Sequence, residues 1–202
     1  MMMSSSNVEI YHQDSLPFGL SLGEWSAIWW QWLLTIPKSR NPAMDLSGQN
    51  AAIGQPKSNV FFLCQTTENI DQSPTRRVSI PKGTSLFLPV INWVSNFYEH
   101  GDSEEDLIKI ARERMDIIGN LEFYLNGKSV QGLEKYRFLS QFFSVDLPSD
   151  NIFDLPAGQT RLVSDGYWVF TKPIMMDATI HTFGTCSSGV TKIGINYQIK
   201  VI

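Results

Sequence analysis

The segment from Leu22 to Ile36 holds four of the six tryptophans and constrains the fold more than any other feature. Its apolar spacing predicts a helix, because at about 100° per residue these side chains form a broad stripe. Five residues share one face of that helix: Trp25, Ile28, Trp29, Trp32 and Ile36. Trp30 and Leu34 lie on the opposite side. A helix that is apolar around most of its circumference is largely buried, so we expect this one to pack on a sheet.

Both ends of this helix are marked in the sequence. Ser21 followed by Glu24 has the spacing of a capping box, in which each side chain satisfies an amide of the first turn. Pro37 ends the helix because proline cannot continue it. Glu24, Gln31 and Thr35 form a narrow polar strip between the two apolar sides.

Most of the remaining chain predicts short strands separated by Gly and Pro turns, which is typical of a β-sandwich. The expected strands cover 60–64, 77–80, 86–91, 121–125, 138–145, 163–170, 179–183 and 192–201, and a second helix covers about 104–118. Asn126-Gly127 is a strong hairpin signal. We therefore expect a mainly β fold, a jelly-roll-like β-sandwich with a Trp-rich N-terminal helix. Residues 1–202 form one domain, with 1–14 as a poorly ordered leader.

Composition excludes several classes of protein. Charged residues are only 18% and aromatic residues 12%, so the chain has enough apolar surface to fold. The net charge of −4 gives no basic excess for nucleic acid. No stretch has the roughly 18 apolar residues of a membrane span, and no secretory signal is visible. Cys64 and Cys186 are far apart in sequence, so we expect reduced thiols and a cytoplasmic location.

Several motifs occur in a characteristic order: GEWSAIWWQWLLTIP, NPAMDLSGQN, NVFFL, TRRVSIPKGTSLFLPVIN, DGYWVFTKPI and ATIHTF. In this order the chain resembles a widespread family of small, mostly hypothetical bacterial proteins, many of them exported. The shared pattern is a Trp-rich opening helix, an NPxxDxxG loop, an IPxGxxLFxPxxN stretch and a closing DGYW…HTIxF strand pair. The resemblance covers nearly the whole chain and implies kinship, but no shared activity.

The resemblance also implies one difference. Exported relatives carry a cysteine after the NPxxDxxG loop and another before the IPxG turn, and the matching positions here are Ala51 and Val78. If those cysteines pair in the relatives, this chain has lost both the disulfide and the export signal, as expected for a cytosolic branch.

The Trp-rich helix has two interpretations. In the first, it is a core helix whose rings fill the space over a sheet. In the second, the polar strip of Glu24, Gln31 and Thr35 lines a pocket beside Trp30. An apolar wall there would raise the pKa of the Glu24 carboxyl and let it exchange protons. The capping box alone also explains Glu24.

His181 is the second candidate. If its strand pairs with the strand of Asp165 and Tyr167, the three form a cluster that polarises a carbonyl or transfers a proton. The alternatives are that Asp165-Gly166 is a turn and that His181 bonds a backbone carbonyl. Asn92, after an apolar strand, either binds a ligand or closes its own turn.

The acidic run 99–106 suggests a cation site with His100, but its spacing matches no calcium loop. Acidic residues are also expected in a first helical turn, with Asp102 or Ser103 as the cap, and we favour this interpretation. No nucleophile elbow and no Walker spacing is present. We therefore expect neither metal nor cofactor.

Two functions remain. In the first, an aromatic-lined pocket binds a small, largely apolar or ring-bearing molecule, with Trp30, Gln31 and Asn92 as binding residues. Metal-free acid/base chemistry of the isomerase, cyclase or lyase type would then use Glu24, Tyr167 and His181. In the second, the chain is a protein-interaction or homo-oligomer module that exposes Trp30 and Leu34.

Overall fold

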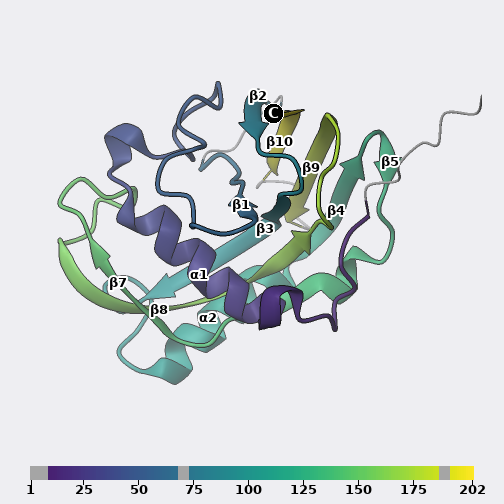
Figure 1. The fold of residues 1–202 in the computed structure, drawn as a ribbon. Coiled ribbons are helices and arrows are strands. Elements are labelled where there is room, and N and C mark those ends of the chain that lie inside the picture. Colours follow the sequence, from purple (N-terminus) through teal and green to yellow (C-terminus); the bar gives the residue numbers. More distant parts are fainter. Residues whose placement is uncertain (1–8, 68–72, 187–191) are drawn as a thin grey trace, which may run out of the picture.

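The computed structural model of the chain describes residues 9–67, 73–186 and 192–202 (Figure 1). These residues form two mixed β-sheets and two α-helices, which confirms the predicted mainly β class. The first eight residues of the predicted leader lie outside the described residues. Within its remainder, Ile10 forms a β-bridge with Thr171, and the Tyr11 N–H donates to the Phe170 carbonyl at 2.7 Å.

Sheet one is built around two long strands. Its members are β1 (Val60–Phe62), β3 (Ser85–Asn96), β8 (Gly158–Phe170), β6 (Arg137–Leu139) and β7 (Phe143–Leu147). β1 pairs in parallel with β3, β3 pairs antiparallel with β8, and both β6 and β7 pair with β8. The single strand expected over 138–145 is thus two strands.

Sheet two contains β2 (Thr75–Ile80), β10 (Lys192–Val201), β9 (Ala178–Cys186), β4 (Ile118–Leu125) and β5 (Lys128–Ser129), in that order. β2 is parallel to β10, and the other pairs are antiparallel. Asn126 and Gly127 join β4 to β5 with φ values of 52° and 73°. Two positive φ values in succession are those of a type I′ hairpin turn, which fits the Asn-Gly signal.

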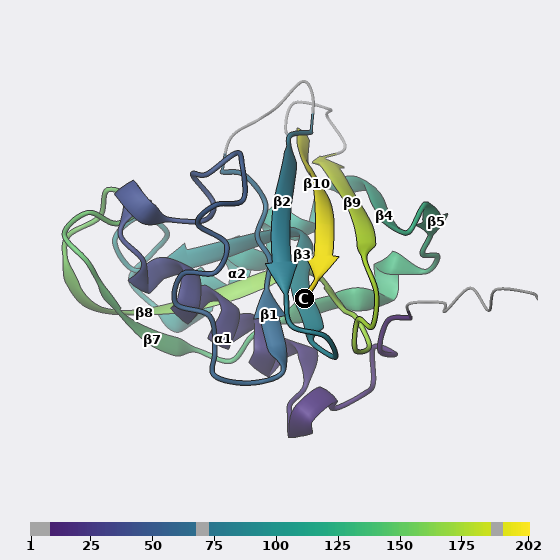
Figure 2. The same cartoon turned by 45° about the horizontal axis from the view of Figure 1, so that its top comes forward.

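The elements form three layers. α1 (Leu22–Thr35) crosses one face of sheet one, and sheet two and α2 (Glu104–Asp116) cover the other face (Figures 1 and 2). β8 and β9 therefore belong to different sheets. The hypothetical pairing of the strand of Tyr167 with the strand of His181 is wrong, since β9 pairs with β10 and β4 instead.

α1 begins at the predicted capping box. The Glu24 N–H donates to the Ser21 hydroxyl at 3.3 Å, and the Glu24 carboxylate accepts from the Ser21 N–H at 2.8 Å. The helix is buried on both apolar sides: Trp30 is 6% exposed and Leu34 0%. The partner surface expected from these two side chains is therefore not exposed.

α2 begins at a second capping box. Ser103 caps the helix, its hydroxyl accepting from the Asp106 N–H at 3.1 Å. The acidic first turn thus serves the helix start, as favoured above. Among the described residues no group of His, Cys, Asp and Glu side chains is arranged to hold a metal ion. None of the described helices is long and apolar enough to cross a membrane.

Candidate functional site

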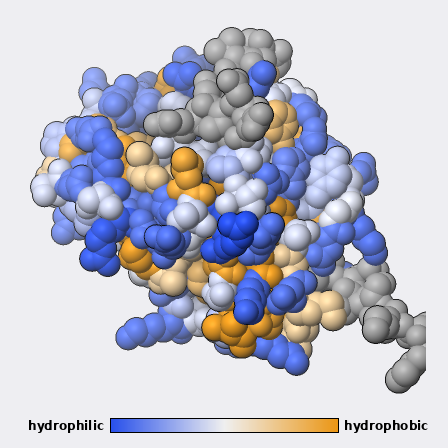
Figure 3. Space-filling view, turned by 90° about the horizontal axis from the view of Figure 1, so that it is seen from above, coloured by the Kyte–Doolittle hydropathy of each residue, from blue (hydrophilic) through white to orange (hydrophobic). Residues whose placement is uncertain are grey.

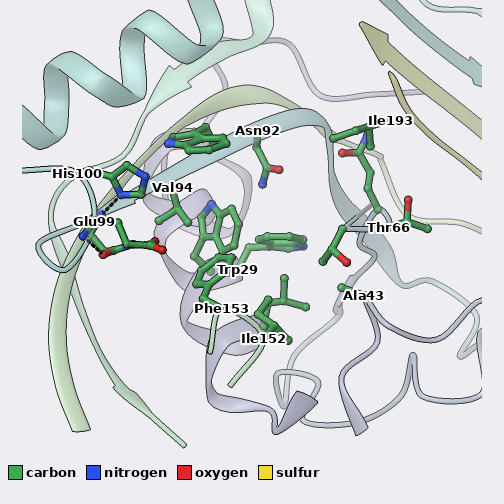
Figure 4. A pocket seen from close by; sticks show the side chains of 16 residues that line it. Trp29, Ala43, Thr66, Asn92, Val94, Glu99, His100, Ile152, Phe153 and Ile193 are labelled. Atoms are coloured by element: carbon green, nitrogen blue, oxygen red, sulfur yellow. Dashed lines mark hydrogen bonds between the residues drawn. The ribbon is translucent and has the colours of Figure 1, made fainter. Parts of the chain in front are cut away.

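A cavity of about 380 Å³ lies between α1 and the second half of β3 (Figure 4). Its walls come from α1, β3, the start of β10, Ala43 and the segments 65–67, 99–100 and 152–153. The aromatic and aliphatic lining residues are Trp29, Trp30, Leu33, Ala43, Trp93, Val94, Ile152, Phe153 and Ile193. In Figure 4, Asn92 points from β3 into the space between these side chains.

The cavity exists because β1 is short. β1 pairs with β3 only over Ser85–Phe87, so the edge of β3 beyond Phe87 has no neighbouring strand. Just after β1, the Leu63 N–H still donates to the Phe87 carbonyl at 3.0 Å, and the next contact with this edge within the described residues is the Gln65 carboxamide, which donates to the Val90 carbonyl. The second half of β3 therefore has an edge without a neighbouring strand, and this edge borders the cavity beside α1.

Three of the four α1 tryptophans fix the helix through their indole N–H groups. Trp25 donates to the Pro17 carbonyl at 2.8 Å, Trp29 to Leu63 at 2.8 Å and Trp32 to Ile53 at 2.9 Å. Trp30 differs, because its Nε1 has no hydrogen-bond partner among the described residues. Its ring instead lines the cavity, 5.0 Å from the Trp29 ring and 6.2 Å from Phe153, measured between centroids.

Trp93 lies on the face of β3 that packs toward sheet two and α2, and its ring borders the cavity. The Arg114 guanidinium of α2 lies 4.7 Å from the Trp93 ring centroid, and the His100 ring meets it edge-on at 5.6 Å. A cation over an indole face is attracted by the ring quadrupole, by about 0.5–1 kcal/mol at an exposed site. These contacts fix the orientation of Trp93.

The cavity concentrates polar atoms without partners. Within the described residues, buried side-chain donors without an acceptor include Trp30 Nε1, Asn92 Nδ2 and Trp93 Nε1, all from cavity-lining residues. The others are Trp168 Nε1 and the hydroxyls of Ser85, Ser95 and Ser164, which are not among the lining residues. A buried donor left without an acceptor costs about 1–3 kcal/mol. A rotation of the Asn92 carboxamide also lets it present its oxygen.

The rim of the cavity is polar and hydrogen-bonded. Asn96 donates from its Nδ2 to the Glu99 carboxylate at 3.1 Å and from its backbone N–H to His100 Nδ1 at 3.2 Å. Because Nδ1 of His100 accepts, the neutral ring carries its proton on Nε2. Glu99 is exposed, so this carboxylate lies at the mouth of the cavity.

A buried network supports the other rim. Asn41 donates to the Leu33 and Ile36 carbonyls at the end of α1 and accepts from the Ala43 N–H. Arg76, 1% exposed, donates to the carbonyls of Cys64, Asp45 and Ala43, which holds the loop that contributes Ala43 to the cavity. Burial raises the pKa of the neighbouring Cys64 thiol, which disfavours the reactive thiolate form.

The structure places the three predicted catalytic residues in separate environments. Glu24 is held by Ser21, whose hydroxyl and backbone N–H lower the pKa of its carboxyl. Tyr167 lies in the core between the two sheets. His181 lies on the side of β9 opposite the buried Ile180, with its Nδ1 2.7 Å from Asn196 Oδ1. None of the three lines the cavity, so no acid/base cluster forms.

The predicted binding residues are divided. Trp30 and Asn92 both line the cavity, whereas Gln31 lies elsewhere and donates to the Ser144 carbonyl at 2.9 Å. Asn92 does not close a turn, because β3 continues to Asn96. Asp165-Gly166 is not a turn either: it lies inside β8, where Arg137 donates to the Asp165 carboxylate at 2.7 Å. Sequence reasoning missed Trp93, although it follows Asn92 directly.

Comparison with known proteins gives little further information. No protein-family model matches the chain, and no curated protein is similar to it. Among solved structures, a chain from "Structure of PbICP-C in complex with falcipain-2" is similar at 10% identity and a TM-score of 0.27, with 72% of this chain and 100% of that chain covered. A likeness this weak carries no argument about fold or function.

Proposed function

We propose that this protein binds a small, largely apolar, ring-bearing molecule in the cavity between α1 and β3. The observation that carries the proposal is that three residues lining one cavity, Trp30, Asn92 and Trp93, each have a buried side-chain donor that lacks a partner within the described residues. Cores seldom leave such donors unsatisfied without a reason. A bound molecule with an acceptor atom supplies one.

The size and the walls of the cavity support the same proposal. Its volume of about 380 Å³ is within the usual range of ligand sites, roughly 300–1,000 Å³. The walls are mainly aromatic and aliphatic, with a few polar groups, which is the composition that orients a small molecule. Offset and edge-on contacts between aromatic rings add about 0.5–1.5 kcal/mol each beyond burial.

Acid/base catalysis is not part of this proposal, because Glu24, Tyr167 and His181 do not meet. The interaction-module alternative loses its main feature, since Trp30 and Leu34 are buried. The face seen in Figure 3 is mostly hydrophilic, with several groups of hydrophobic side chains among the polar ones. Large interaction surfaces are usually continuous apolar patches.

The experiment uses 2-naphthol as the probe and measures quenching of tryptophan fluorescence and isothermal titration heat. Ala43, which is 3% exposed and lines the cavity, is replaced in the variant Ala43→Leu to fill part of the space. Ala52→Leu in the same loop is the matched control, because Ala52 is exposed and does not line the cavity.

We expect the wild type and Ala52→Leu to bind 2-naphthol equally, with a Kd in the micromolar to low millimolar range, as is usual for so small a ligand. Ala43→Leu should bind at least tenfold more weakly while keeping the native circular dichroism spectrum. Absence of binding to the wild type, or equal loss in both variants, would contradict the proposal. Native mass spectrometry of the protein as purified would then search for a co-purified molecule.

A further inference from the structure

At the N-terminal end of the unpaired edge of β3, a side chain forms the hydrogen bond that a neighbouring strand would otherwise form. Pro89 has no N–H, and the Val90 carbonyl accepts from the Gln65 carboxamide. Gln65 is 6% exposed, so this contact is inside the protein. The Val90 carbonyl at this end of the edge therefore has a partner within the protein.

At the C-terminal end of the same edge, the backbone groups of Asn96 are also hydrogen-bonded. The Asn96 N–H donates to His100 Nδ1 at 3.2 Å, and the Asn96 carbonyl accepts from the His100 N–H at 3.1 Å. Because both backbone groups of Asn96 turn toward His100, they point away from β8. In an antiparallel ladder the direction alternates every residue, so the backbone groups of Val94 and Asn92 also point away from β8.

The partner strand confirms this direction. Ser164 of β8 lies opposite Val94. The Ser164 N–H donates to the Ser140 hydroxyl at 3.0 Å, and its carbonyl accepts from the Ser140 N–H at 2.8 Å. Both backbone groups of Ser164 therefore face away from β3, as they do in a pair of residues that exchange no hydrogen bonds.

Asn92 and Val94 are thus the residues of this edge whose backbone N–H and C=O groups remain unpaired within the described residues. Neither residue forms a backbone hydrogen bond on this side with any part of the chain that the structure describes. Both residues line the cavity. Each offers an N–H donor and a C=O acceptor side by side, and equivalent groups of the two residues are about 7 Å apart. The cavity is therefore bounded by a two-residue length of unpaired strand with indole rings nearby.

We propose that the ligand ring carries an N–H and a C=O on adjacent atoms, as in a lactam, an imide or a nucleobase, and pairs with the β3 edge at Asn92 or Val94. This inference rests on the proposed function and specifies its ligand class. The ring N–H donates to a strand carbonyl and the ring carbonyl accepts from the strand N–H, so the ligand replaces a neighbouring strand.

An extended peptide fits this edge less well. Strand addition needs several consecutive ladder positions. Here Gln65 and His100 occupy the positions on either side of the free pair. A flat ring spans one or two residues and needs no passage beyond them. No lysine or arginine lines the cavity among the described residues, whereas Glu99 does, which favours a neutral ring over an anion.

The test compares three probes of nearly identical shape. 2-Quinolone carries an adjacent N–H and C=O, coumarin replaces the N–H with a ring oxygen, and naphthalene has neither group. Titration calorimetry on the intact protein gives the affinities, and ¹⁵N–¹H spectra report the backbone amides. Ser95 is the internal control, because its N–H points toward β8.

We expect 2-quinolone to bind at least tenfold more tightly than coumarin and naphthalene, since a site made for a donor and an acceptor rejects an analogue that lacks one. The Asn92 or Val94 amide should shift downfield with 2-quinolone, and the Ser95 amide should not. Equal affinity for all three probes would overturn the inference and leave the proposed function standing. Absence of binding by all three would overturn both.

Discussion

The two faces of sheet one are packed in different ways. On the α1 side the core is aromatic: Trp25, Trp29, Phe87 and Trp168 meet mostly edge-on or tilted, with Phe87 and Trp168 stacked at 5.2 Å. On the side of sheet two the core consists mainly of aliphatic side chains from alternate strand positions. Flexible aliphatic side chains fill a gap between sheets closely. Large rigid rings between a helix and a sheet leave space where β1 ends, and the candidate site lies there.

The largest expected effect is a difference in stability loss between substitutions on the two faces of sheet one. Phe123 of β4 is 0% exposed between the sheets, whereas Phe153 lines the cavity and is only half-buried. Phe123→Ala should cost about 3–5 kcal/mol of unfolding free energy, because it opens a void in a filled core. Phe153→Ala should cost roughly 1 kcal/mol, because its ring already adjoins empty space. Urea unfolding measures both, and equal costs would show that the cavity side is packed as densely as the other.

A second comparison uses two tryptophans of the same core. Trp168 and Trp30 both have an indole N–H without a partner within the described residues, but only Trp30 lines the cavity. Trp168→Phe should cost about 1–3 kcal/mol of stability and leave 2-naphthol binding within twofold of the wild type. Trp30→Phe should cost less stability but weaken 2-naphthol binding at least fivefold. The reverse pattern in calorimetry and urea unfolding would place the site elsewhere in the core.

The smallest expected effect concerns the start of α1 and the dependence of stability on pH. Hydrogen bonds from Ser21 lower the pKa of the Glu24 carboxyl below its ordinary value of 4.5. A lowered pKa in the folded state means that the ionised form adds stability above about pH 4.5, and that this contribution is lost as the pH falls through the lowered pKa.

Glu24→Gln should therefore lose less stability than the wild type between pH 5 and pH 3. The effect is small, because the carboxylate is only partly buried and glutamine keeps an acceptor for the capping box. Urea midpoints of both proteins across this pH range provide the measurement, and 2-naphthol binding at pH 5 should be the same for both. A difference in 2-naphthol affinity between the two proteins would show that Glu24 contributes to the binding site.

Local signals in the sequence predicted much of the fold. The capping box at Ser21, the stop at Pro37 and the Asn126-Gly127 turn act within a few residues, so the sequence alone reveals them. Strand pairing is different, because it depends on contacts between distant residues. The strands of Tyr167 and His181 follow each other in the chain, yet the segment between them crosses from one sheet to the other. That crossing separates the predicted catalytic cluster.

The candidate site was predictable only in part. The helical wheel isolated Trp30 as the tryptophan outside the main core face, and the structure places Trp30 beside the cavity together with Asn92. The helical wheel did not predict that the Gln31 carboxamide donates a hydrogen bond to the Ser144 carbonyl. The free edge of β3 depends on where β1 stops and on the Gln65 and His100 caps, and no local pattern marks those contacts.

The most direct test of the central claim is a ¹⁵N–¹H spectrum of the six tryptophan indoles during titration with 2-naphthol. Each indole N–H gives its own signal, so the spectrum shows which rings the ligand reaches. The cavity predicts that the Trp30 and Trp93 signals shift in a saturable way, while the signals of Trp25 and Trp168 stay within the line width. Shifts at Trp25 or Trp168 without shifts at Trp30 would contradict the assignment of this cavity as the binding site.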